Sequence, residues 1–206
     1  MRTGMNSAGS AAAVFAARQT ENAARPSGKD GTFGGKRILV ACFSRADENY
    51  GVGVIEKGNT AVLAEIIAER KGADLFRIER ENAYPAGYRA CTDEARREQK
   101  SSARPALKKD CSPEAYEVIF LGYPIWWGDM PMPVYTWLES HAFENKTIIP
   151  FCTHEGSGLS GTPEKIAARC RSAAVLPGFA LRGAAAHNSR DKARDAVHEW
   201  LGKLAI

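Results

Sequence analysis

The chain has 206 residues, of which 44% are hydrophobic, and carries a formal net charge of +4. This length suits one well-buried domain and is short for two. No stretch approaches the ~18 consecutive apolar residues of a membrane span, and residues 36–206 are close to neutral, without a broad basic surface for nucleic acid. We therefore expect a soluble protein without a membrane span or a nucleic-acid partner.

Residues 1–35 are rich in Gly, Ala, Ser, Asn and Arg and have no periodic apolar face. This composition predicts a disordered leader, followed by one folded domain over residues 36–206. The Ala-rich segment at residues 10–17 has about the length of the apolar part of an export signal, but it is poor in Leu and Ile. We expect a cytoplasmic protein, and the alternative is an exported protein whose signal is truncated.

Short apolar runs alternate with helical patterns from Lys36 onward, which is typical of a parallel sheet covered by helices on both faces. The run at residues 37–43 is continuously apolar, as expected for a central strand. Further strands are expected at 73–80, 118–121, 147–152 and 174–181, the last interrupted by Pro177-Gly178. Helices are expected at 60–71, 88–100, 131–141, 162–170 and 189–204.

Thr162-Pro163-Glu164 predicts a helix start, with Thr162 as N-cap and Pro163 at the first helical position. Five strands and five helices in alternation predict an α/β three-layer sandwich. Its five-stranded parallel sheet would have the order 2-1-3-4-5, the flavodoxin-like order.

The five cysteines are odd in number and have no C-x-x-C spacing, which argues against a disulfide framework or a zinc site. We assign no metal ligands.

In this strand order, the loops after the first, third and fourth strands open at the same end of the sheet. The first loop begins with Ser44-Arg45 and ends with Gly58-Asn59-Thr60 at a helix start. Free backbone N–H groups and the helix dipole favour a phosphate there. Asn59 or Thr60 can instead be an ordinary N-cap, and capping and phosphate binding are compatible.

The second loop places two adjacent indoles, Trp126 and Trp127, at the end of a buried strand. This position suits a flat aromatic ligand, although the indoles can also close the core or an oligomer interface. The third loop, residues 153–161, is rich in glycine, which lets its backbone approach a ligand edge. A plain flexible loop has a similar composition, and the convergence of all three loops favours a ligand site.

The stretches Phe43-Ser44-Arg45, Gly58-Asn59-Thr60, Tyr123-Pro124-Ile125-Trp126-Trp127 and Thr153-His154-Glu155-Gly156-Ser157-Gly158 resemble the three FMN-contacting loops of flavodoxin-like proteins. The resemblance covers residues 36–206 and implies FMN as cofactor. It implies that the phosphate is held by Ser44, Arg45, Asn59, Thr60 and the amide of Ala61. The ribityl chain and one ring face would meet Pro124, Ile125, Trp126, Trp127 and Gly128. The pyrimidine side would meet Thr153, His154, Glu155, Gly156 and Gly158.

The chain departs from the flavodoxin pattern at residues 46–57, which separate Arg45 from Gly58 and carry Asp47, Glu48 and Glu56. Loop-closure entropy grows slowly with length, so such an excursion is tolerable. We expect it to fold over the rim of the site with its acids turned away from the phosphate.

The resemblance implies an FMN-dependent redox protein, either an electron carrier for a redox partner protein or a reductase. The reductase would take electrons from NAD(P)H and pass them to a small acceptor such as a quinone; a homodimer is left open. The mildly basic charge favours the reductase, because carriers present acidic surfaces to basic partners. His154 is a candidate proton donor, although a lone loop histidine is more often a structural donor, and no other catalytic residue is assigned.

Two alternatives come from other classes. A non-catalytic module can keep the flavodoxin fold without its cofactor. A Ser-dependent hydrolase is disfavoured, because the chain has no G-x-S-x-G elbow and Ser157 and Ser160 have no evident base partner.

Overall fold

The computed structural model describes residues 32–33 and 35–204, so most of the predicted leader lies outside the described residues. The sequence assigns Thr32–Phe33 to that leader, yet these residues form a short strand, β1. This strand pairs antiparallel with the start of β2 (Lys36–Cys42).

A parallel sheet forms the centre of the molecule. The strands β5 (Asp74–Arg77), β2, β6 (Val118–Pro124) and β7 (Thr147–His154) lie side by side in this order. Both β8 (Ala174–Val175) and β9 (Phe179–Arg182) pair in parallel with β7. The predicted flavodoxin-like α/β class is confirmed.

The sheet differs in detail from the five-stranded expectation, because β1 joins it and the last expected strand is divided into β8 and β9, giving seven strands. The division falls at Pro177-Gly178. Proline has no N–H to donate to a strand ladder. A Cβ on Gly178 would lie 2.9 Å from the carbonyl oxygen of Pro150, so only glycine fits this close approach.

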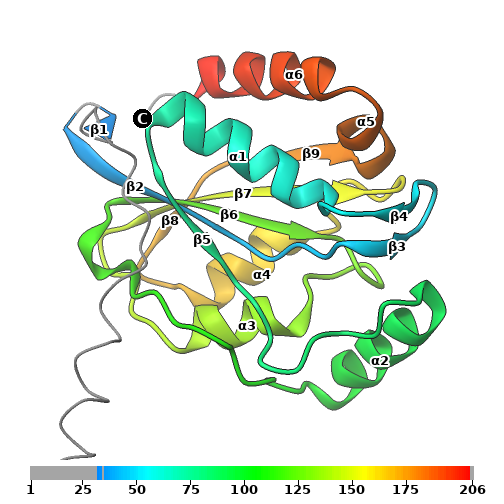
Figure 1. Ribbon diagram of the computed structural model, residues 1–206. Helices are drawn as coiled ribbons and strands as arrows, with labels where there is room; N and C mark the ends of the chain where they lie inside the picture. Colours follow the sequence, from blue (N-terminus) through cyan, green and yellow to red (C-terminus); the bar gives the residue numbers. More distant parts are fainter. Residues whose placement is uncertain (1–31, 34, 205–206) are drawn as a thin grey trace, which may run out of the picture.

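Helices cover both faces of the sheet (Figure 1). One face carries α1 (Asn59–Lys71), α5 (Gly183–Asn188) and α6 (Arg190–Lys203). The other face carries α3 (Met132–Glu139) and α4 (Thr162–Arg169), and α2 (Tyr88–Ser101) contacts α3. The short helix α5 is an addition to the expected five, and a 3-10 turn at Pro113–Ala115 precedes β6.

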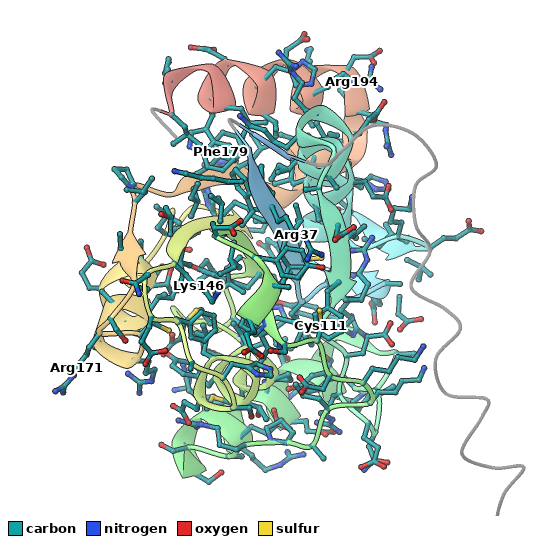
Figure 2. The ribbon with its side chains drawn as sticks, turned by 90° about the vertical axis from the view of Figure 1, so that its left-hand side faces the viewer. Arg37, Cys111, Lys146, Arg171, Phe179 and Arg194 are labelled. Atoms are coloured by element: carbon teal, nitrogen blue, oxygen red, sulfur yellow. The ribbon has the colours of Figure 1, made fainter. Side chains whose placement is uncertain are left out.

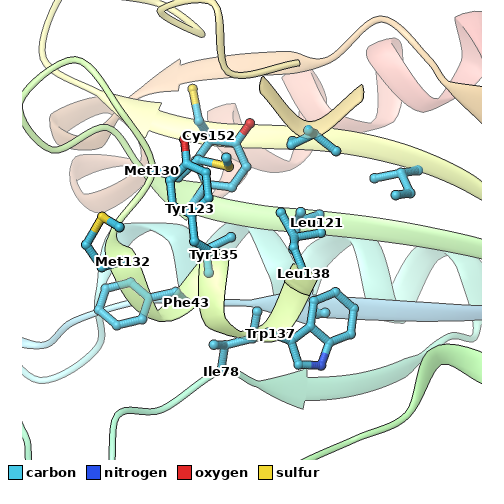
Figure 3. Packing of buried hydrophobic residues seen from close by; sticks show 14 of the residues in the cluster. Phe43, Ile78, Leu121, Tyr123, Met130, Met132, Tyr135, Trp137, Leu138 and Cys152 are labelled. Carbon is cyan, nitrogen blue, oxygen red and sulfur yellow. The ribbon is translucent and has the colours of Figure 1, made fainter. Parts of the chain in front are cut away.

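Neighbouring residues of the central strands enter different cores. Ile38 and Val40 of β2 pack on the side of α1 and α6, whereas Leu39 and Ala41 pack on the side of α3. Figure 3 shows the α3 side, where Trp137 of α3 lies among the buried residues that face the sheet. The continuous apolar run of β2 is therefore explained by burial on both faces.

The predicted N-cap at Thr162 is wrong. The residue before α4 is Gly161, which adopts a left-handed conformation with φ of 68°, and no side chain caps the helix. The Thr162 hydroxyl is buried, donates to the carbonyl oxygen of Leu159 at 2.6 Å and accepts from the Tyr123 hydroxyl at 2.8 Å. Satisfying the buried phenol of Tyr123 takes this hydroxyl away from the helix end.

The amino ends of the strands lie opposite the three loops and are closed by polar contacts. Figure 2 views this end, with Arg37 and Lys146 labelled. The backbone N–H of Arg37 donates to Glu117 Oε2 at 2.6 Å, and Lys146 Nζ donates to the carbonyl oxygens of Glu114 and Tyr116. The carboxyl ends of the strands remain for the candidate site.

Within the described residues, no helix is both long and apolar enough to cross a bilayer, and no group of three or more His, Cys, Asp or Glu side chains could hold a metal ion. The five cysteines are free thiols.

Candidate functional site

A cavity of about 410 Å³ opens at the carboxyl end of the sheet, within the size range of small-molecule sites. The predicted residues that it brings together are Asn59, Pro124, Ile125, Trp126, Trp127, Thr153, His154 and Glu155. The other predicted residues lie outside its lining: Ser44, Arg45, Thr60, Ala61, Gly128, Gly156 and Gly158. The cavity thus combines parts of all three predicted loops.

The start of α1 leaves two backbone donors available. The N–H groups of Ala61 and Val62 both donate to the carbonyl oxygen of Gly58, and that of Ala61 also donates to Ser44 Oγ at 3.0 Å. The N–H groups of Asn59 and Thr60 meet no acceptor among the described residues. Since no side chain caps this helix, ordinary capping does not account for Asn59 and Thr60.

Gly58 is required by close packing at this helix start. A Cβ there would lie 2.3 Å from both Ser44 Oγ and the carbonyl oxygen of Arg45. The backbone of Arg45 cannot move away as a flexible side-chain end can. The Gly58 position therefore holds the first loop tightly against α1.

Asn59 carries an unsatisfied polar atom. Its Oδ1 is buried without a hydrogen-bond partner among the described residues, and its side chain lines the cavity. A buried acceptor without a donor costs about 1–3 kcal/mol. A ligand hydroxyl or N–H in the cavity would remove this cost.

Glu155 faces the same region but has its own partner. Its Oε1 accepts from the N–H of Ala184 at 3.2 Å, which fixes the carboxylate at the start of α5. Gly183, next to this contact, lines the cavity, and a Cβ on it would lie 2.6 Å from Asn59 Nδ2 and 2.7 Å from Glu155 Oε1. The bare backbone of Gly183 makes room for both side chains.

The Trp126 and Trp127 loop is a tight hairpin turn. Trp126 and Asp129 exchange backbone hydrogen bonds of 2.8 and 3.0 Å, and the two residues between them have positive φ, 52° at Trp127 and 72° at Gly128. These are the φ signs of a type I′ turn, which favours Asn-Gly. Gly128 thus serves the turn rather than the lining, and Trp127 is held in a strained conformation of the kind that clusters at functional sites.

The two indoles have different surroundings. Trp126 is half-buried and packs edge-on against Phe43 and Tyr84, with ring centroids 5.4 and 5.2 Å away. Trp127 is 47% exposed, its Nε1 donates to the carbonyl oxygen of Thr92 at 2.9 Å, and the guanidinium of Arg96 lies 4.2 Å from its ring centroid. Trp126 therefore belongs to both the core and the cavity, whereas Trp127 is fastened to the surface of α2.

His154 lines the cavity in its neutral form. Its Nδ1 accepts from the N–H of Gly156 at 2.8 Å, so the neutral ring carries its proton on Nε2. Burial lowers the pKa of His154; Glu155 opposes this shift and Arg182 adds to it. The Gly156 amide, which the resemblance implies for the pyrimidine side, already has an acceptor. Gly156 and Gly158 supply positive φ, 138° and 60°, to the loop.

Thr60 and Thr153 are buried, and their hydroxyl oxygens lie 2.7 Å apart. Thr153 lines the cavity, whereas the Thr60 side chain points into the protein and leaves only its backbone N–H at the helix start.

Arg45 lies where the resemblance places it in sequence, but its guanidinium binds protein carbonyls. Its Nη1 donates to the carbonyl oxygen of Glu48, and its Nη2 donates to those of Pro85 and Ala86. Its side chain therefore ties residues 46–57 to the segment before α2. No residue of type Lys or Arg is part of the described cavity lining.

The excursion forms a hairpin of β3 (Asp47–Asn49) and β4 (Gly53–Ile55). Asn49 and Tyr50 line the cavity, so this segment forms part of the cavity wall, and that it folds over the rim of an FMN site stays a prediction. Glu48 Oε2 accepts from the N–H of Tyr88 at 2.8 Å, which turns this acid toward α2.

The cavity lining also contains residues that were not predicted from the sequence: Asn49, Tyr50, Tyr88, Thr92, Ala95 and Gly183. Three of them lie on α2 at positions i, i+4 and i+7, which share one face of a helix. That spacing was the available signal, because it places an aromatic, a hydroxyl and a small side chain on one face.

Comparisons with known proteins agree with this architecture. The family model described as Flavodoxin matches residues 37–204. A protein of Bacteroides uniformis ATCC 8492 assigned as a flavoprotein has 28% identity and a TM-score of 0.64, covering 82% of this chain and 99% of that chain. Its counterpart from Bacteroides eggerthii DSM 20697 has 27% identity and a TM-score of 0.63, covering 83% and 99%.

A flavoprotein of Lactobacillus acidophilus NCFM, crystallised in complex with FMN, has 18% identity and a TM-score of 0.55, covering 70% of this chain and 93% of that chain. No curated protein sequence matches the chain. Since the family model spans most of its length, this chain belongs to the flavodoxin family.

Proposed function

We propose that this protein binds FMN in the cavity at the carboxyl end of its sheet and uses it to reduce a small acceptor. Membership of the flavodoxin family supports the cofactor, as does the FMN complex of the similarly folded Lactobacillus acidophilus flavoprotein. The observation that carries the proposal is a cavity lined by aromatic side chains and by Asn59, whose backbone N–H meets no acceptor among the described residues and whose buried amide oxygen has no partner there.

The residues present fit the phosphate and the ribityl chain. The N–H groups of Asn59 and Thr60 and the α1 dipole would hold the phosphate, with the Ser44 hydroxyl as a further donor. The Ala61 amide would contribute only by giving up its bond to Ser44. A ribityl hydroxyl would satisfy the buried Oδ1 of Asn59.

The residues around the ring fit a flat heterocycle. Trp126, wedged between Phe43 and Tyr84, forms a rigid apolar wall that excludes water. His154, neutral and protonated on Nε2, would donate a hydrogen bond near the ring or relay a proton. Pro124, Ile125 and Thr153 complete this side of the lining.

When bound, FMN supplies hydride and electron transfer. With a reduced nicotinamide as donor and a quinone as acceptor, the nicotinamide gives up a hydride. The quinone gains two electrons and two protons, of which one proton comes from water. The protein positions the reactants, and its exposed cavity mouth admits a small molecule.

Tyr50 and Trp127 line the cavity and are exposed, so they would be accessible to a small planar molecule. This exposure favours a reductase over an electron carrier. The test is NADH and NADPH oxidation by the FMN-loaded protein with 1,4-naphthoquinone as acceptor. Turnover with either donor is expected. A protein that binds FMN but turns over with no donor would instead be a carrier for a partner protein.

A further inference from the structure

We infer that Tyr50 and Tyr88 form a stacking subsite for a planar aromatic acceptor at the mouth of the cavity. The inference rests on the proposed function, because it concerns the molecule that receives the electrons. It adds a binding subsite built from the β3–β4 hairpin and the start of α2, outside the three predicted cofactor loops.

The two phenol rings are close together and open to solvent. Their centroids lie 6.0 Å apart with an angle of 40° between the planes, and both side chains line the cavity. Tyr50 is 63% exposed and Tyr88 is 38% exposed. Aromatic rings associate at centroid separations of about 4.5–7 Å. An added planar ring can therefore stack on this pair.

Polar contacts fix the hairpin that carries Tyr50 to the start of α2, which carries Tyr88. Arg45 donates to carbonyl oxygens on both sides, those of Glu48 and of Pro85 and Ala86. Glu48 joins the same two segments. Its backbone N–H donates to the carbonyl oxygen of Ala86, and its carboxylate accepts from the backbone N–H of Tyr88. The two backbone segments that carry the rings are thus held together before a ligand arrives, which reduces the entropy cost of binding.

The chemistry of the pair favours an acceptor with carbonyl oxygens. Burial raises the pKa of Tyr88, and neighbouring groups including Tyr50 and Glu155 raise it further, so the phenol stays protonated. Because the two rings are inclined by 40°, one ring of the pair can stack on an aromatic plane while the phenol of the other donates to a carbonyl oxygen of the same ligand. A quinone offers both features, whereas a small inorganic acceptor offers neither.

The indole rings are engaged by more protein groups than the two phenol rings. Trp126 is locked against Phe43 and Tyr84, and Trp127 has the Arg96 guanidinium over its ring. Tyr50 and Tyr88 have no such cationic cover in the described part of the chain.

The variants Tyr50→Ala and Tyr88→Ala test the inference against Val54→Ala. Val54 is on the same hairpin, is 82% exposed and is not part of the cavity lining. With FMN-loaded protein, each tyrosine variant should raise the KM for 1,4-naphthoquinone about three- to tenfold, the range of one lost aromatic pair. The kcat/KM for ferricyanide and the Kd for FMN should stay unchanged, and Val54→Ala should match wild type in every assay. Tyr50→Phe should keep most of the naphthoquinone binding.

An unchanged KM for naphthoquinone in both alanine variants would overturn the inference. So would a weaker FMN Kd in these variants, since the rings would then cover the cofactor. Binding of 1,4-naphthoquinone to FMN-free protein, measured by equilibrium dialysis, keeps the two proposals apart. Weaker binding by Tyr50→Ala than by wild type supports the subsite even if wild-type protein binds no FMN, and equal binding by wild type and variants refutes it.

Discussion

The hydroxyl oxygens of Thr60 and Thr153 lie 2.7 Å apart, so the first turn of α1 is hydrogen-bonded to the carboxyl end of β7. Both side chains are buried. This contact joins the helix start that would hold the phosphate to the loop that carries His154. The two ends of the proposed cofactor site are therefore built on one frame.

Replacing either threonine with valine should destabilise the protein, because the remaining hydroxyl would be buried without its partner. Each of Thr60→Val and Thr153→Val should lower the free energy of unfolding by about 1–3 kcal/mol. The double variant should cost less than the sum of the singles, since both polar groups are then removed. Urea denaturation of the four proteins measures this coupling, and strictly additive losses would contradict it.

Gly183→Ala should disturb the cavity directly. Its Cβ would overlap Asn59 Nδ2 and Glu155 Oε1, at 2.6 and 2.7 Å, so both side chains must shift. We expect a loss of about 1–3 kcal/mol in stability from overpacking and a weaker FMN Kd.

The matched control is Gly202→Ala in α6, where an added Cβ has no neighbour within 4 Å. This variant should raise stability by up to about 1 kcal/mol, because alanine is the better helix former. Its FMN Kd should equal that of wild type. Equal FMN affinity in Gly183→Ala and Gly202→Ala would argue against cofactor contact at Asn59.

Trp127→Asn should separate flavin binding from stability. Asparagine suits the positive φ of this turn position, which offsets the lost hydrogen bond to Thr92 and the lost contact with Arg96. Stability should change by less than about 1 kcal/mol, while the FMN Kd rises up to tenfold through lost stacking. Fluorescence titration with FMN and urea denaturation give the two values.

Trp126→Ala should behave differently, because this indole also packs against Phe43 and Tyr84. We expect a stability loss approaching the roughly 3 kcal/mol of a buried tryptophan, together with weaker FMN binding. If Trp126→Ala and Trp127→Asn gave the same stability, the assignment of Trp126 to the core would be wrong.

His154 should make stability depend on pH. Burial lowers its pKa in the folded protein, so the unfolded chain binds the proton more readily and stability falls as pH decreases. This contribution is present above the unfolded pKa of about 6.5 and is lost as pH falls through the lower folded value. Urea denaturation at about pH 7.5 and about pH 5 should show a smaller pH-dependent loss in His154→Gln than in wild type. An equal loss in both proteins would assign the effect to other groups.

Long, strongly patterned elements were predictable from the sequence. The continuous apolar run of β2 and the periodic apolar face of α6 follow directly from which of their residues are buried. The interruption at Pro177-Gly178 was also predictable, because it follows from backbone chemistry.

The contacts of individual polar side chains were not predictable, because they depend on tertiary neighbours. Thr162 has the sequence of an N-cap, but the buried Tyr123 hydroxyl beside it takes its oxygen. Arg45 has the sequence position of a phosphate ligand, but the hairpin at residues 46–57 brings the carbonyl oxygens of Glu48 and Ala86 within its reach. Only the folded hairpin reveals that Tyr50 lies beside Tyr88.

The proposed binding of FMN is tested by titrating the purified protein with FMN while flavin fluorescence and visible absorbance are recorded. We expect saturable quenching of flavin fluorescence at one FMN per chain, a shifted absorbance spectrum, and weaker binding by Gly183→Ala. Unquenched fluorescence and an unshifted spectrum throughout the titration of the wild-type protein would contradict it.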